Sequence, residues 1–168
     1  VDEAQVREVI GSFVGGYDQI PPMYSALKVN GKKLYELARA GKEVERQARH
    51  VDLPAIEILE IRLPVVKFRV ECSKGTYIRS LCADIGGKLG CGGTMQSLVR
   101  TRVGEFRLAD ALTLAQLQEL RDTDRLEEAL LPTDRIFADF NAVHVEEKWR
   151  KLIDNGNAFY PGQTMEQT

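Results

Sequence analysis

One arginine stands where a strand, a tight turn and a helix are expected to meet. Arg79 lies near the end of the stretch Cys72-Ser73-Lys74-Gly75-Thr76-Tyr77-Ile78-Arg79-Ser80-Leu81. There it would share the first helical turn with Tyr77. The positive end of a helix dipole does not favour a cation, so this position indicates an arginine recruited for a partner. On this residue alone, an ordinary surface arginine is an equally open interpretation.

The residues on either side predict the strand and the helix. Apolar residues alternate with charged ones over residues 66–72, which is typical of a half-buried strand. Residues 78–89 carry apolar side chains at helical spacing, and Gly90 suits a left-handed C-terminal cap. We expect Gly75 to take a positive φ and Thr76 to cap the helix with its hydroxyl.

The rest of the chain predicts an α+β fold with a mixed, largely antiparallel sheet and flanking helices. Capping boxes are expected at Asp2 with Gln5, at Thr113 with Gln116, and at Asp124. Further helices are predicted at residues 3–13, 33–40, from 114, 124–130 and 146–153, and strands at residues 24–29, 51–63, 65–72, 95–102 and 141–145.

Length and composition indicate one globular domain with at most a small appendage. The 168 residues are 43% hydrophobic and 29% charged. No apolar run approaches the roughly 20 residues of a membrane span, and the first residues do not form a signal peptide. We therefore expect a soluble, cytoplasmic protein. Cys72, Cys82 and Cys91 lack metal-ligand spacing, so reduced core thiols are expected and a metal site is not.

The net charge of −2 hides an uneven distribution of charge. Residues 28–50 hold seven Lys/Arg against three Glu, and residues 67–102 hold seven against two acidic residues. Residues 103–168 hold seven basic against thirteen acidic residues. Phosphate binding explains both basic stretches, with solvated surface as the alternative. Direct phosphate contact by the acidic stretch is not expected.

Two ordered strings carry a family resemblance. One is Lys-Gly-Thr-Tyr-Ile-Arg at residues 74–79, followed by Asp-Ile-Gly at 84–86 and Leu-Gly-Cys-Gly at 89–92. The other is Gln-Ile-Pro-Pro-Met-Tyr-Ser-Ala-Leu-Lys-Val-Asn-Gly-Lys-Lys-Leu-Tyr-Glu-Leu-Ala-Arg at residues 19–39. Together they resemble bacterial tRNA pseudouridine synthase B, the TruB family.

The resemblance implies a division of the chain. Residues 1–135 would be the C-terminal part of the catalytic domain, with an RNA-gripping insertion at about residues 19–50. Residues 136–168 resemble the start of a small PUA-like appendage.

The resemblance also implies an activity. The full enzyme would isomerise a T-loop uridine of tRNA to pseudouridine as a monomer, without cofactor or metal, after the nucleotide leaves the stack. The family's nucleophilic aspartate belongs to an upstream Gly-x-Leu-Asp-Pro type motif that is not in this sequence. We therefore expect this chain alone to be inactive.

The resemblance assigns site residues as well. Arg79 matches the arginine that pairs with the nucleophilic carboxylate, Tyr77 an aromatic residue against the nucleotide, and Leu98 an apolar wall of the pocket. Tyr35 is expected to pack on the inner face of its helix. The expected RNA-binding residues are basic or aromatic: Tyr24, Lys28, Lys32, Lys33, Arg39, Lys42, Arg46, Arg49 and Lys74.

Two other functions remain open at this point. The basic insertion could serve a non-catalytic RNA-binding module. The chain could also belong to the guide-RNA-dependent branch of pseudouridine synthases, although residues 24–31 resemble the bacterial, stand-alone form more closely.

Overall fold

The computed structural model describes residues 1–158 and 160. The chain forms two compact units that divide between Leu98 and Val99. Among the described residues, no helix is both long and apolar enough to cross a membrane.

A long β-hairpin is the framework of the first unit. Strand β5 (Ala55–Arg62) pairs antiparallel with β6 (Val65–Glu71). In β6 the side chains of Val66, Phe68 and Val70 are partly buried and those between them are exposed. The predicted half-buried strand is therefore confirmed.

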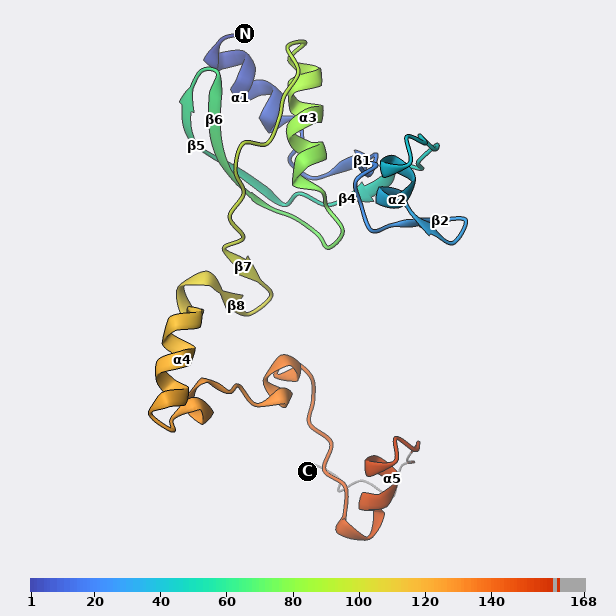
Figure 1. The fold of residues 1–168 in the computed structure, drawn as a ribbon, viewed down its shortest axis with the longest axis vertical. Coiled ribbons are helices and arrows are strands. Elements are labelled where there is room, and N and C mark those ends of the chain that lie inside the picture. The colour runs from blue at the N-terminus through green and yellow to red at the C-terminus, as the bar shows by residue number, and fades with distance from the viewer. Residues whose placement is uncertain (159, 161–168) are drawn as a thin grey trace. The chain divides into compact units, whose positions relative to one another are not determined.

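Two helices cover the apolar side of this hairpin. They are α1 (Glu3–Gly11) and α3 (Ile78–Lys88), which lie side by side (Figure 1). The predicted capping box is present at the start of α1. The Asp2 side chain accepts the backbone N–H of Gln5 at 2.8 Å, and the Gln5 side chain accepts the backbone N–H of Asp2 at 2.9 Å. The core side chains come from both helices, the turn after α1 and the loop before β5: Val6, Ile10, Phe13, Leu53, Leu81 and Ile85.

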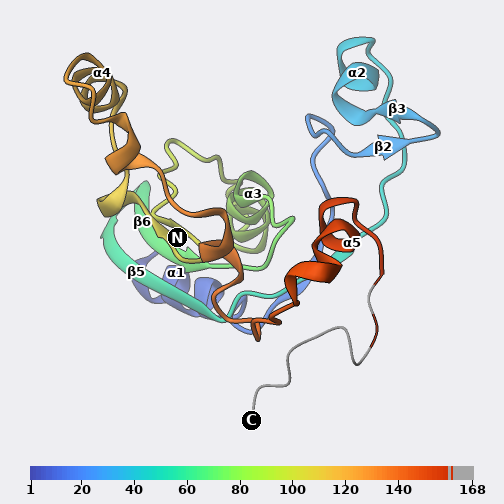
Figure 2. The same cartoon turned by 90° about the horizontal axis from the view of Figure 1, so that it is seen from below.

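The insertion leaves and re-enters the first unit through two paired strands. These are β1 (Tyr17–Gln19) and β4 (Arg49–Val51), which run antiparallel. Between them lie β2 (Lys28–Val29), β3 (Lys32–Lys33) and α2 (Leu34–Arg39), which stand apart from the long hairpin (Figure 2). The predicted turn at Asn30-Gly31 is confirmed, with φ of 51° and 79°.

The second unit consists of short elements. A small hairpin joins β7 (Arg102–Val103) to β8 (Phe106–Arg107), and two α-helices follow, α4 (Leu114–Asp122) and α5 (Arg150–Asp154). The single 3-10 turns are η1 (Leu108–Asp110), η2 (Leu126–Ala129), η3 (Thr133–Phe137) and η4 (Glu147–Trp149). Thr113 forms its predicted capping box with Gln116. No described residue of this unit is buried.

The α+β class is confirmed, and all strand pairs within the described part of the chain are antiparallel. Several strand predictions are wrong in their bounds. The strand predicted at 51–63 is divided at residues 52–54 between β4 and β5, and only Lys28–Val29 of residues 24–29 is a strand. Residues 95–101 contain no strand, and residues 141–145 contain only a single bridge residue.

Three local predictions are also corrected. Asp124 does not cap a helix but takes a left-handed φ of 57°, and only the 3-10 turn η2 follows it. Thr76 does not cap α3, because Tyr77 is the N-cap residue and no side chain caps it. Cys72 and Cys91 are exposed rather than in the core; all three cysteines are unpaired thiols, and burial raises the pKa of Cys82.

Candidate functional site

The turn between β6 and α3 is held by hydrogen bonds from its own side chains. Gly75 takes the predicted positive φ, 84°, and the Thr76 hydroxyl donates to the Ser73 carbonyl at 2.8 Å. The Ser73 hydroxyl accepts the backbone N–H of Asp52 at 3.0 Å, which ties the turn to the loop before β5. Lys74 is exposed on this turn. The first residues of α3 therefore start from a fixed position.

Arg79 lies one residue into α3 and contacts the insertion. Its Nη2 donates to the backbone carbonyl of Tyr24 at 2.8 Å. The residue is otherwise exposed, and no carboxylate among the described residues pairs with it. Because a guanidinium has five N–H donors, this single bond leaves most of them available to a further acceptor.

Gln19 joins the base of the insertion to the start of α3. Its side chain is only 2% exposed. The Gln19 Oε1 accepts the backbone N–H of Tyr77 at 2.8 Å, and its Nε2 donates to the Tyr77 carbonyl at 3.1 Å. The buried amide of Gln19 thus bonds to both the backbone N–H and the backbone carbonyl of Tyr77, the N-cap residue of α3. We call this pair of bonds the Gln19 latch.

Tyr17 extends the latch to the second turn of α3. Its hydroxyl accepts from Gln19 Nε2 at 2.6 Å and donates to Asp84 Oδ2 at 2.8 Å. Burial raises the pKa of Tyr17 well above its usual value; the bond from Gln19 opposes this rise and the Asp84 carboxylate adds to it. The phenol therefore stays protonated, and Asp84 binds Tyr17 rather than Arg79.

The sequence did not predict the roles of Tyr17 and Gln19. The only signal was their alternation with exposed Asp18, which places both on the inner face of a short strand. A glutamine usually lies on the surface, so its burial here depends on meeting the backbone of Tyr77. That partner lies 58 residues further along the chain.

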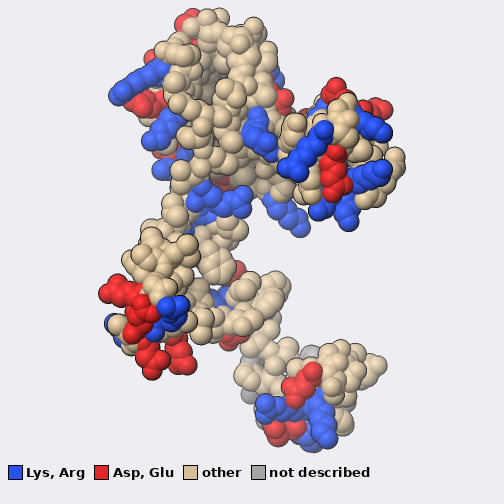
Figure 3. All heavy atoms as spheres, viewed as in Figure 1, with Lys and Arg blue, Asp and Glu red and all other residues tan. Residues whose placement is uncertain are grey.

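Basic side chains gather on the insertion, where Figure 3 shows several blue groups together with red ones. Lys33 Nζ and the Arg39 guanidinium lie 5.4 and 5.3 Å from the centre of the Tyr35 ring, and Lys33 also donates to the Tyr35 hydroxyl at 3.3 Å. Tyr35 is partly buried, as a packing residue would be. Tyr24 is 58% exposed. The other predicted cations of the insertion are exposed as well: Lys28, Lys32, Lys42 and Arg49.

Arg46 differs from the other basic residues of the insertion. Its side chain is 23% exposed and donates to the Pro21 carbonyl at 3.1 Å and to Glu43 at 3.4 Å. These bonds join the two halves of the insertion across 25 residues of sequence. The contacts of Arg46 are therefore those of a structural residue.

Leu98 is not part of the hydrogen-bonded cluster around Arg79. It lies outside any strand at the end of the first unit and is 54% exposed. The structure brings Arg79, Tyr77 and Tyr24 together through the latch and the Arg79 bond. Within residues 1–158 and 160, no group of His, Cys, Asp and Glu is arranged to hold a metal ion.

Comparison with known families agrees with this arrangement. Residues 1–78 match the TruB family pseudouridylate synthase N-terminal domain, and residues 79–138 match the tRNA pseudouridylate synthase B C-terminal domain. The chain belongs to the TruB family of pseudouridylate synthases, as the two sequence strings predicted.

Individual relatives are similar over most of this chain. It is 50% identical to tRNA pseudouridine synthase B of Clostridium acetobutylicum over 92% of the chain and 52% of the relative. It is 48% identical to tRNA pseudouridine synthase B of Dechloromonas aromatica over 94% of the chain and 52% of the relative. The chain thus spans about half the length of the curated relatives that it matches.

Solved structures share the fold. The Cbf5-Nop10-Gar1 complex contains a chain with a TM-score of 0.71 and 29% identity, over 93% of this chain and 45% of that one. The archaeal box H/ACA sRNP Nop10-Cbf5 complex contains one with a TM-score of 0.72 and 25% identity, over 98% of this chain and 46% of that one.

Proposed function

We propose that the chain is part of a tRNA pseudouridine synthase that isomerises a uridine of the T-stem-loop. The observation that carries this proposal is the position of Arg79. Its guanidinium lies at the start of α3 and bonds to the base of a basic insertion, in a chain of the TruB family. An RNA held by the insertion would therefore be held close to Arg79.

In this proposal Arg79 orients a nucleophilic carboxylate and keeps it ionised. A planar guanidinium can form a charge-assisted pair with a carboxylate while one N–H remains on Tyr24. Asp84 does not supply that carboxylate, because it accepts the hydrogen bond from Tyr17. This agrees with our expectation that the described chain alone forms no pseudouridine.

Tyr77 would contact the flipped nucleotide. The target base must leave its stack to be detached and rejoined through carbon, and an aromatic ring can replace the lost stacking. The Gln19 latch fixes the backbone of Tyr77, which limits where the ring can lie. Leu98 is proposed as an apolar wall, and neither cofactor nor metal is required.

The insertion would grip the RNA through phosphates and splayed bases. We assign phosphate contacts to its exposed and half-buried cations and a base contact to Tyr24, with Lys74 as a further contact from the turn before α3. Arg46 would act indirectly, by holding the insertion together through Pro21. The cations assigned to phosphate are Lys28, Lys32, Lys33, Arg39, Lys42 and Arg49.

Identity favours a stand-alone tRNA enzyme over a guide-RNA-dependent one. The chain is about 50% identical to bacterial tRNA pseudouridine synthase B and 25–29% identical to the Cbf5 chains. We further propose a cytoplasmic monomer in which residues 1–135 belong to the catalytic domain and residues 136–168 begin an RNA-binding appendage.

The first test replaces Arg79 in a protein of the relatives' full length. Arg79→Lys should lower single-turnover pseudouridine formation by at least about a hundredfold, because an ammonium cannot reproduce the planar fork against a carboxylate. RNA affinity should stay within about threefold, since the charge is kept. Rates and dissociation constants measured on the same T-stem-loop RNA separate the two effects, and a near-normal rate would refute the assignment.

The second test separates the enzyme from a non-catalytic RNA-binding module. Charge reversal of Lys32, Lys33 and Arg39 together should weaken T-stem-loop binding strongly and reduce its salt dependence. A matched triple reversal in the second unit, at Arg121, Arg125 and Arg135, gives the same change of net charge. Equal loss in both triples would remove the insertion as the grip, and binding without any turnover by the full-length protein would favour the module.

A further inference from the structure

The small hairpin of the second unit places two arginines opposite each other. Arg102 in β7 pairs across the hairpin with Arg107 in β8, and Val103 pairs with Phe106. A two-residue turn, Gly104-Glu105, joins the strands, and Gly104 supplies the positive φ of 55° that this turn uses.

The register brings these two side chains as close as a hairpin allows. The next pair outward is closed by a bond from the Leu108 N–H to the Thr101 carbonyl at 2.8 Å. Hydrogen-bonded and non-hydrogen-bonded pairs alternate along an antiparallel ladder. Arg102 and Arg107 therefore form the non-hydrogen-bonded pair, in which opposite side chains are nearest.

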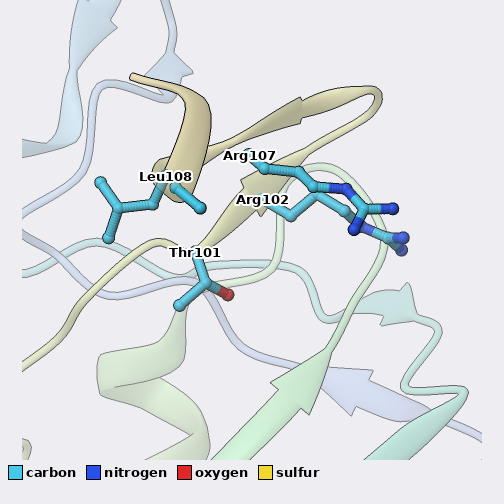
Figure 4. A pocket seen from close by; sticks show the side chains of 5 residues that line it. Thr101, Arg102, Arg107 and Leu108 are labelled. Carbon is cyan, nitrogen blue, oxygen red and sulfur yellow. The ribbon is translucent and has the colours of Figure 1, made fainter. Parts of the chain in front are cut away.

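Both guanidinium groups extend to the same side of the hairpin. Figure 4 shows the two side chains running parallel with their nitrogen atoms adjacent, at the edge of a hollow that Thr101, Leu108 and Ala109 also line. Like charges directly opposite each other destabilise a strand pair unless a counter-ion lies between them. An anion bound on this side would relieve that repulsion.

The two arginines differ in the partners that they have. The Arg107 guanidinium makes no ion pair or hydrogen bond within the part of the chain that the structure describes. Arg102 has a partner of its own, yet each guanidinium offers five donors and can bind two acceptors at once. The nearest acid in sequence, Glu105, is exposed in the turn beyond the next strand pair.

We propose that Arg102 and Arg107 form a phosphate-binding fork that holds a backbone phosphodiester of the RNA. This inference rests on the proposed RNA substrate and extends the RNA contacts beyond the insertion. It includes Arg107, which lies in the acidic stretch 103–168 where no direct phosphate contact was expected. Two adjacent guanidinium groups can each donate charge-assisted hydrogen bonds to the oxygens of one phosphate. The acids of the stretch do not prevent this, because most of them follow the hairpin, from Asp110 onward.

The first experiment measures T-stem-loop binding to the chain over a range of salt concentrations. Arg107→Gln should weaken binding by about tenfold at moderate salt and should reduce the slope of log affinity against log salt by about one. Arg135→Gln is the matched control, because Arg135 is another exposed arginine of the same unit without an ion pair among the described residues. The control should change neither quantity.

The second experiment does not depend on RNA. Titration with inorganic phosphate should shift the side-chain Nε signals of Arg102 and Arg107 saturably in NMR spectra, and should leave that of Arg135 unchanged. Arg107→Lys keeps the charge and loses the fork, so it should reduce the shift at Arg102. Circular dichroism of each variant establishes that the fold is kept.

The two experiments separate failure of this inference from failure of the proposed function. If Arg107→Gln binds RNA with the slope of the Arg135→Gln control, the fork does not hold RNA even though the RNA-binding function stands. If no T-stem-loop binds but the phosphate shifts appear, the fork is a site for a free phosphate and the RNA substrate is wrong. The absence of both responses overturns the fork itself.

Discussion

The two units of this chain are stabilised in different ways. In the first unit, helices α1 and α3 pack on a hairpin around six buried apolar side chains. In the second unit no described residue is buried, and even Leu114, at the start of α4, is 86% exposed. Burial of apolar surface is the main source of folding free energy. This burial therefore stabilises chiefly the first unit.

Local interactions define the second unit instead. Helix α4 begins at the Thr113 capping box. The side-chain pairs in this helix and just after it join residues only three or four positions apart, such as Gln118 with Asp122 and Arg125 with Glu128. Solvent screens exposed pairs of this kind, so each contributes little to the free energy of folding. The comparison shows that the candidate site lies in the unit whose geometry is fixed by packing.

The largest expected difference between the units concerns leucine truncation. Leu81→Ala should lower the free energy of unfolding by about 3 kcal/mol, because Leu81 is fully buried in the first unit's core. Leu114→Ala should change it by less than about 0.5 kcal/mol. Urea denaturation followed by circular dichroism gives both values. Similar values for the two variants would contradict the contrast.

Loss of the Gln19 latch should have the next largest effect. Gln19→Leu leaves the backbone N–H of Tyr77 without its buried acceptor, while the Tyr77 carbonyl keeps its bond from the Leu81 N–H at 3.1 Å. This loss should cost about 2 kcal/mol. Gln118→Leu is the matched control, since it removes only an exposed bond to Asp122. Amide exchange at Tyr77 should accelerate in the first variant alone; unchanged exchange would mean that the latch does not fix the start of α3.

Cap removal should have the smallest effect and should stay local in the second unit. Thr113→Ala should destabilise α4 by about 1 kcal/mol, because the N-terminal N–H groups lose their acceptor. Hydrogen exchange should rise over α4 and not over α1. Asp2→Ala removes the corresponding cap of α1, and this helix packs on the core. Hydrogen exchange in α1 should therefore require unfolding of the whole first unit. A Thr113→Ala effect that spreads to α1 would show that the units are not independent.

The sequence by itself determined features that depend on neighbouring residues. The capping boxes at Asp2 and Thr113, the turn at Asn30-Gly31 and the alternation along β6 follow from side chains within a few positions of each other. The family followed from two ordered strings, and the position of Arg79 at the start of a helix followed from the periodicity after it. Each of these depends on local sterics or on a short-range hydrogen bond.

Only the tertiary structure decided which residues hold the site together. Gln19 meets Tyr77 and Tyr17 meets Asp84 across 58 and 67 residues, and no local pattern encodes such a meeting. The same holds for Arg46, whose bond to the Pro21 carbonyl joins two segments that lie 25 residues apart in the sequence. Polar side chains are buried only where a distant partner satisfies them, and the fold alone supplies that partner.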